Sequence, residues 1–169
     1  HQELAQHYRE RVAELARTIA SKAPQPKDPF WVESRAETLL QLGDRAGAIA
    51  LYKSIVERSR DGHVARVLGD IHVDLPKGPD IEAAIHWYTI ATRTPERYHD
   101  HVQAHTALCY LYRHRAPANF KAAANSCRSA ANAGGEIGLF WLGIFRATGL
   151  GVVRDEADAT RLIAQARDA

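Results

Sequence analysis

Proline and glycine residues divide this chain at nearly regular intervals, and their spacing constrains the fold more than any other feature. Between the breaks lie segments of roughly 12 to 20 residues with apolar residues three and four apart, the spacing that forms one apolar helix face. These segments are rich in Ala and lack the sustained alternation of apolar and polar residues that strands show. We therefore expect an all-α fold, with breaks at 24–29, Gly43, Gly62, 76–79, Pro95, Pro117, 134–135 and 149–151.

The composition is that of an ordinary globular protein, with 169 residues of which 46% are hydrophobic and 25% charged. The 22 Lys and Arg residues nearly balance the 20 Asp and Glu residues, and they are scattered along the chain. This pattern predicts no nucleic-acid partner. No run approaches ~18 consecutive apolar residues, so we expect no membrane-spanning segment. Because the sequence begins with His1 and not with Met, a removed leader stays open and the compartment is not fixed.

The N-terminal part differs in character from the rest. Residues 2–22 carry one apolar stripe opposite charged residues, which predicts an amphipathic helix. Three prolines between residues 22 and 29 then deny helix continuity. We expect residues 1–29 to form a helix and a Pro-rich linker, and residues 30–169 to form a second region. The helix would cap that region or mediate oligomerisation through its stripe, which consists of Leu4, Tyr8, Val12, Leu15 and Ile19.

Residues 30–169 repeat a motif of two helices. In each unit a first-helix anchor, small in three of the four units, is followed roughly 12 to 16 residues later by an Ala in the second helix, so the two backbones can approach closely. Pairs of this kind complete one another's core by stacking, which predicts a solenoid of antiparallel helix pairs. The expected loops lie near 43–45, 75–80, 116–119 and 148–154. The expected anchors are Ala36, Gly69, Leu108 and Gly143, and their second-helix partners are Ala48, Ala84, Ala123 and Ala159.

The last unit carries a more specific pattern. Leu142-Gly143 is followed by a Gly-Leu-Gly-Val loop, an Asp and an Ala-rich second helix. Residues 142–166 closely resemble the Sel-one-like repeat, and residues 68–91 resemble it less fully. Residues 30–57 look more like a tetratricopeptide repeat, and the unit at 108–131 is supported mainly by its register. The resemblance implies a right-handed superhelix, a bacterial source with cytoplasm or periplasm as the compartment, and a role in protein–protein contact.

The register of tetratricopeptide arrays implies a binding face along the first helices. We expect a concave groove that binds a peptide, a helix or a partner subunit. Three of its side chains are of types common at binding hot spots. For Phe140 the alternative is that it covers the end of the array or meets a further repeat. The expected partner-binding residues are Glu37, Arg66, Asp70, His105, Tyr112, Arg113 and Phe140.

Two other functions stay open. The chain could be a structural subunit of a bacterial secretion or envelope polysaccharide assembly, which is a setting of the family. It could also be a metal-dependent enzyme that uses His99, His101 and His105, although the Glu of a zinc-protease motif is missing. Nothing in the sequence requires a reaction, a metal or a cofactor, so we expect a binding protein and no enzyme.

Two cysteines lie on the two helices of the third pair. Cys127 takes a position that other units fill with a bulky side chain, which favours a small reduced core residue. A disulfide with Cys109 would need Cα atoms within about 7 Å, which spacing alone does not establish. The sequence therefore favours free thiols and leaves the pairing open.

Overall fold

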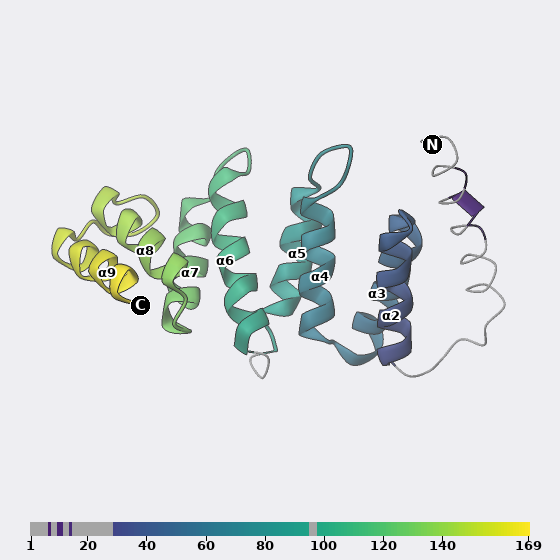
Figure 1. The fold of residues 1–169 in the computed structure, drawn as a ribbon. Coiled ribbons are helices and arrows are strands. Elements are labelled where there is room, and N and C mark those ends of the chain that lie inside the picture. The colour runs from purple at the N-terminus through teal and green to yellow at the C-terminus, as the bar shows by residue number, and fades with distance from the viewer. Residues whose placement is uncertain (1–6, 8–9, 12–13, 15–28, 95–97) are drawn as a thin grey trace. The chain divides into compact units, whose positions relative to one another are not determined.

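The structure is a computed structural model of the chain, and it describes residues 7, 10, 11, 14, 29–94 and 98–169 (Figure 1). Every regular element in these ranges is a helix, so the expected all-α class is confirmed. Residues 7, 10, 11 and 14 are helical, and the rest of the helix expected at 2–22 lies outside the described residues. The chain divides into two compact units, residues 1–60 and 61–169.

The first unit contains one helix pair, α2 (Pro29–Gln41) and α3 (Arg45–Ser59), whose helices pack on each other. Ala36 and Ala48 are fully buried, as expected of the small residues at a close helix approach. The Asp44 side chain caps α3 by accepting a hydrogen bond of 3.0 Å from the Gly47 amide. This pair has the anchors that the sequence predicts.

The second unit contains three helix pairs. They are α4 (Gly62–Val73) with α5 (Ile81–Ala91), α6 (Tyr98–His114) with α7 (Phe120–Asn132), and α8 (Glu136–Thr148) with α9 (Glu156–Asp168). Each helix packs on the next one along the chain, and α6 also contacts both α4 and α8. The first helices of the three pairs therefore lie side by side as one layer, which we call the inner layer.

Two glycines show how closely the paired helices approach. A Cβ atom added at Gly69 would lie 2.7 Å from the ring of Tyr88, and one at Gly143 would lie 2.7 Å from Cγ1 of Ile163. Contacts this short leave no room for a side chain, which is why these positions are glycine. Tyr88 and Ile163 each lie four residues after a buried Ala of the second helix. The predicted anchors of these two pairs are confirmed.

The third pair needs a correction, because its anchor is Cys109 and not Leu108. Cys109 forms a disulfide with Cys127, with Cα atoms 5.1 Å apart, so the free thiols favoured by the sequence are wrong. Cys127 lies four residues after Ala123, in the position that Tyr88 takes in the preceding pair. The disulfide therefore joins the two positions at which the other two pairs of the second unit place a glycine against a bulky side chain.

The helices end close to the predicted loops. Asp80, Asn119 and Asp155 cap α5, α7 and α9 by accepting hydrogen bonds from amides of the first helical turn, at 3.1, 3.0 and 2.9 Å. Gly149 ends α8 with φ of 74°, a left-handed conformation that glycine adopts without steric cost. The breaks near 75–80, 116–119 and 148–154 are confirmed as loops.

A candidate binding groove on the inner layer

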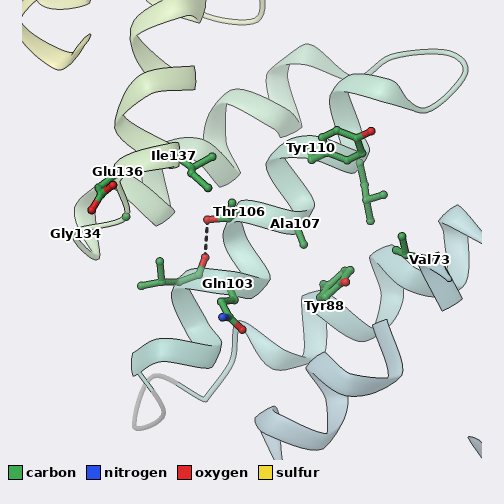
Figure 2. Close-up of a pocket in the computed structure, with 12 residues that line it drawn as sticks. Val73, Tyr88, Gln103, Thr106, Ala107, Tyr110, Gly134, Glu136 and Ile137 are labelled. Carbon is green, nitrogen blue, oxygen red and sulfur yellow. Dashed lines mark hydrogen bonds between the residues drawn. The ribbon is translucent and has the colours of Figure 1, made fainter. Parts of the chain in front are cut away.

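A cavity of about 500 Å³ lies on the inner layer of the second unit, centred on α6 (Figure 2). Its floor comes from α6 and from Tyr88 of α5, and its two ends come from α4 and from the start of α8. Most of its surface is apolar. The lining residues are Val73, Tyr88, Val102, Gln103, Thr106, Ala107, Tyr110, Leu111, Gly134, Gly135, Glu136 and Ile137.

Large apolar side chains at the cavity are exposed to solvent. Tyr110 is 54% exposed and Ile137 is 58% exposed, and Val73 and the neighbouring Phe140 are exposed as well. Figure 2 shows the side chain of Ile137 on α8 apart from that of Tyr110 on α6, with Ala107 of α6 between and below them. Apolar side chains gathered on one face in this way are typical of a surface that binds a partner.

The polar groups at the cavity are few. The Thr106 hydroxyl donates a hydrogen bond of 2.9 Å to the Val102 carbonyl (Figure 2), so it is already satisfied within α6. The side-chain amide nitrogen of the exposed Gln103 donates a hydrogen bond of 2.7 Å to Nε2 of the exposed His99, and Glu136 lies exposed at the start of α8. The arrangement offers an apolar surface with polar groups at its edges and no pair of groups placed for acid–base chemistry.

A network of charged side chains ties α4 to α5 and α6 beside the cavity. The Asp100 carboxylate accepts a hydrogen bond of 2.6 Å from Nε of Arg66 and lies 3.1 Å from Nδ1 of His63. Arg66 also pairs with Asp70, which accepts a hydrogen bond of 2.6 Å from the Tyr88 hydroxyl. These contacts fix the floor of the groove.

The pKa values within this network follow from the contacts. Burial alone would raise the pKa of the Asp100 carboxyl, but the hydrogen bonds and positive charges of Arg66 and His63 outweigh burial and lower that pKa. Burial and the hydrogen bond to Asp70 raise the pKa of the Tyr88 hydroxyl, so Tyr88 stays neutral and donates. The Asp100 carboxyl is therefore favoured in its charged form, and the Tyr88 hydroxyl in its neutral form.

Beyond the cavity, α6 and α8 are joined by a cation–π contact. The Arg113 guanidinium lies 3.3 Å from the centroid of the Trp141 ring and 5.6 Å from that of Tyr110. Burial lowers the pKa of Arg113 from its ordinary value, while the neighbouring Tyr110 acts in the opposite direction. Arg113 thus lies half-buried at the edge of the groove.

The predicted site residues fall in different environments. Arg66 and Asp70 belong to the charged network, Arg113 stacks on Trp141, and Phe140 is exposed at 42% beside the cavity. Tyr112 packs on the core that surrounds the disulfide. Their roles in binding stay predictions, but the engagement of Arg66 and Tyr112 in packing means that alanine there would also disturb the fold.

His105 and Glu37 lie elsewhere. The His105 ring is half-buried 4.6 Å from the ring of His101, away from the cavity lining. Glu37 is exposed in the first unit, where burial together with the charges of Glu37 and Glu33 raises the pKa of Tyr52 to about 12. Glu37 is not one of the residues that line the cavity of the second unit, and its role in binding stays a prediction.

Three groove residues of α6 were not predicted from the sequence, because the wrong residue was taken as the anchor of the third pair. With Leu108 as anchor, the inner-face positions of α6 include His105 and Tyr112. Moving the anchor by one residue to Cys109 replaces them with other positions, three of which line the cavity. The signal was present in the sequence as a Leu-Cys pair in place of Leu-Gly. These three residues are Gln103, Thr106 and Tyr110.

The histidine cluster does not assemble a metal site. Within residues 29–94, 98–169 and the four described N-terminal positions, no group of three or more His, Cys, Asp and Glu side chains could hold a metal ion. His101 and His105 contact each other, whereas the exposed His99 bonds to Gln103.

No helix in the described part of the chain has both the length and the apolar character needed to cross a membrane.

No family model and no curated protein sequence matches this chain. Solved structures do resemble it. A protective antigen of uropathogenic Escherichia coli, which displays an SLR fold, superposes on 97% of this chain with a TM-score of 0.69 and 19% identity. The Sel1 repeat protein of Oxalobacter formigenes superposes on 98% with a TM-score of 0.61 and 14% identity. This chain has the Sel1-like repeat (SLR) fold.

The SLR fold agrees with the helix pairs and glycine anchors described above, and it confirms the fold that the last unit predicted. This chain spans 39% of the length of the E. coli protein and 62% of that of the Oxalobacter protein. Both neighbours are bacterial, and both are longer than this chain.

Proposed function

We propose that this SLR chain is a protein–protein interaction module that binds a peptide segment or a helix of a partner in the groove on α4, α6 and α8. One observation carries the proposal: Tyr110 and Ile137 are more than half exposed on either side of an apolar cavity. Covering such side chains removes apolar surface from water, which is the main favourable term in protein association.

The character of the groove favours a peptide over a small substrate. Phe140 and Trp141 follow the lining residue Ile137 by one turn of α8, and their rings contact each other with centroids 5.3 Å apart, so apolar surface extends along α8 beyond the cavity. A helix or an extended peptide presents apolar side chains along its length and can contact such a surface at several points. Aromatic side chains are also over-represented among the residues that dominate binding energies.

The experiment uses the full chain as bait in extracts of the source bacterium, with bound proteins identified by mass spectrometry. The groove variant is Tyr110→Lys with Ile137→Lys, which places two charges on the apolar surface without touching the core. The control is Val153→Lys, because Val153 is 80% exposed in the loop before α9.

We expect a protein that wild type and Val153→Lys retain and that the groove variant loses. All three proteins should melt within a few degrees of one another, because the substituted side chains are exposed. Equal retention by the groove variant and wild type would place the binding surface elsewhere and overturn the proposal.

A further inference from the structure

Arg113 differs from comparable arginines of the second unit in what balances its charge. Arg66, Arg115 and Arg146 are similarly half-buried, and each forms an ion pair with a carboxylate on another helix, at 2.6, 2.8 and 3.0 Å. Arg113 has no carboxylate partner among the described residues, and its guanidinium instead forms cation–π contacts with the rings of Trp141 and Tyr110.

The hydrogen-bonding edge of Arg113 is occupied only by an exposed histidine. Nε and Nη2 of Arg113 both point to Nε2 of His114, at 3.1 and 3.0 Å. This pair of donors is one of the edges with which a guanidinium binds both oxygens of a carboxylate. A neutral imidazole offers these two donors a single lone pair, whereas a carboxylate offers each donor its own oxygen. A carboxylate would therefore be a stronger acceptor for this edge than the His114 ring.

Arg113 also lies in line with the apolar groove. Tyr110 of α6 lines the cavity, and Arg113 follows it by one helical turn on the same helix. Ile137 of α8 lines the cavity, and Trp141 follows it in the same way. The Arg113–Trp141 contact therefore continues the surface formed by Tyr110 and Ile137, and it ends that surface with a positive charge.

We infer that the groove binds an acidic peptide segment of a partner protein, with an apolar side chain between Tyr110 and Ile137 and an Asp or Glu carboxylate on Arg113. In the complex the carboxylate accepts hydrogen bonds from Nε and Nη2, and the His114 ring moves into solvent. Because Trp141 holds the guanidinium in place, little side-chain freedom is lost on binding. This inference rests on the proposed function and names the chemistry of its partner.

The test selects peptides from a random phage-displayed library on the full chain. A selected peptide is then synthesised with a fluorescent label, together with a twin in which each acidic residue is replaced by its amide. Binding of both peptides is measured by fluorescence anisotropy to wild type, Arg113→Gln, Arg113→Lys and Tyr110→Lys. The control is Arg154→Gln, which removes the same charge from the exposed loop before α9.

We expect the selected peptides to combine an apolar residue with an acidic one, and wild type to prefer the acidic peptide over its twin by about tenfold or more. Arg113→Gln should bind the two peptides equally, whereas Arg154→Gln should behave as wild type. Arg113→Lys keeps the charge over Trp141 but lacks the two-donor edge, so it should keep only part of the preference and guards against a folding defect in Arg113→Gln.

The outcomes separate this inference from the proposed function. Equal binding of the twins by wild type, or an undiminished preference in Arg113→Gln, overturns the role of Arg113 even if Tyr110→Lys abolishes binding. Failure to select any peptide, or binding that Tyr110→Lys leaves unchanged, overturns both the inference and the groove itself.

Discussion

At the scale of single residues, the absence of a side chain decides how closely the paired helices approach. The space beside Gly143 is filled by Ile163 and by the carbonyl of Ala159, which lies 3.2 Å from an added Cβ. The carbonyl belongs to the backbone and cannot move aside as the end of a side chain can. The same argument applies to Ala84, which has no exposed surface.

Gly143→Leu should therefore lower the free energy of unfolding by about 1–3 kcal/mol or more, because an inserted side chain forces α8 and α9 apart. Ala84→Leu should act similarly on α4 and α5. The matched control is Ala157→Leu, an exposed position on α9, which should change stability by less than about 0.5 kcal/mol. Urea unfolding curves give the comparison, and wild-type stability of both core variants would show that the helix register is wrong.

His105 makes stability depend on pH. Burial, and secondarily the charge of His101, lowers the pKa of His105 from 6.5 to about 4. The unfolded chain therefore binds a proton at His105 before the folded chain does. The contribution of the neutral ring to stability is complete above about pH 6.5 and is lost as the pH falls from there towards about 4.

We expect His105→Gln to be less sensitive than wild type to acidification over this pH range, as measured by melting temperature in buffers of constant ionic strength. The exposed His114→Gln variant serves as the control and should follow wild type. Parallel curves for His105→Gln and wild type would contradict the burial of an uncharged ring.

At the scale of the elements, the disulfide gives the third pair a covalent link where the others rely on packing. Cys109 and Cys127 are separated by 18 residues. Closing a loop of this size restricts the unfolded chain and stabilises the folded state by about 3 kcal/mol. The link also lies in the core on which Tyr112 and Phe145 pack.

Reduction should accordingly lower the melting temperature, because the unfolded chain regains its freedom. The variant in which both cysteines are replaced by Ala should melt below oxidised wild type and should not respond to reductant. Calorimetry with and without a phosphine reductant makes the comparison. Two reactive thiols in unreduced, denatured wild type would show that the bond does not form.

Much of the element pattern could be predicted from the sequence, because helix breaks are local and Gly or Pro marks them. The break before α5 and the Gly-Leu-Gly-Val loop before α9 were located in this way. The site was predicted less well. Leu108 and Cys109 are both buried, so burial alone does not choose between them, and the choice shifts every inner-face residue of α6 by one position.

Contacts between distant residues were not predictable for a different reason. Arg66 and Asp100 lie 34 residues apart, and no spacing rule links two side chains that meet only through the packing of α4 on α6. The stack of Arg113 on Trp141 is of the same kind. Sequence periodicity identifies the face of a helix, but the partner on that face depends on the neighbouring helix.

The segment 2–22 adds a further element in sequence. Its apolar stripe predicts that it packs on another surface, because an isolated helix of this length is marginal in water. Deletion of residues 1–22 should lower the melting temperature or change the molar mass measured by light scattering. A truncated chain that matches the full chain in both measurements would show that the segment contributes nothing to stability or assembly.

In the second unit as a whole, the helix pairs together form a groove that none of them forms alone. One layer of helices places exposed apolar side chains from α4, α6 and α8 around a single cavity, while the second helices supply the packing behind it. We expect this groove, and no other surface of the second unit, to contact the partner.

Amide hydrogen exchange, measured by mass spectrometry with and without the selected peptide, locates the surface that the peptide covers. Binding at the groove should slow exchange in peptides that cover residues 102–113 and 134–141, which include the cavity lining, Arg113 and Trp141. Exchange in α7 and α9 should change little. Protection confined to α7 or α9, with the groove segments unchanged, would place the binding surface on the second helices and not in the groove.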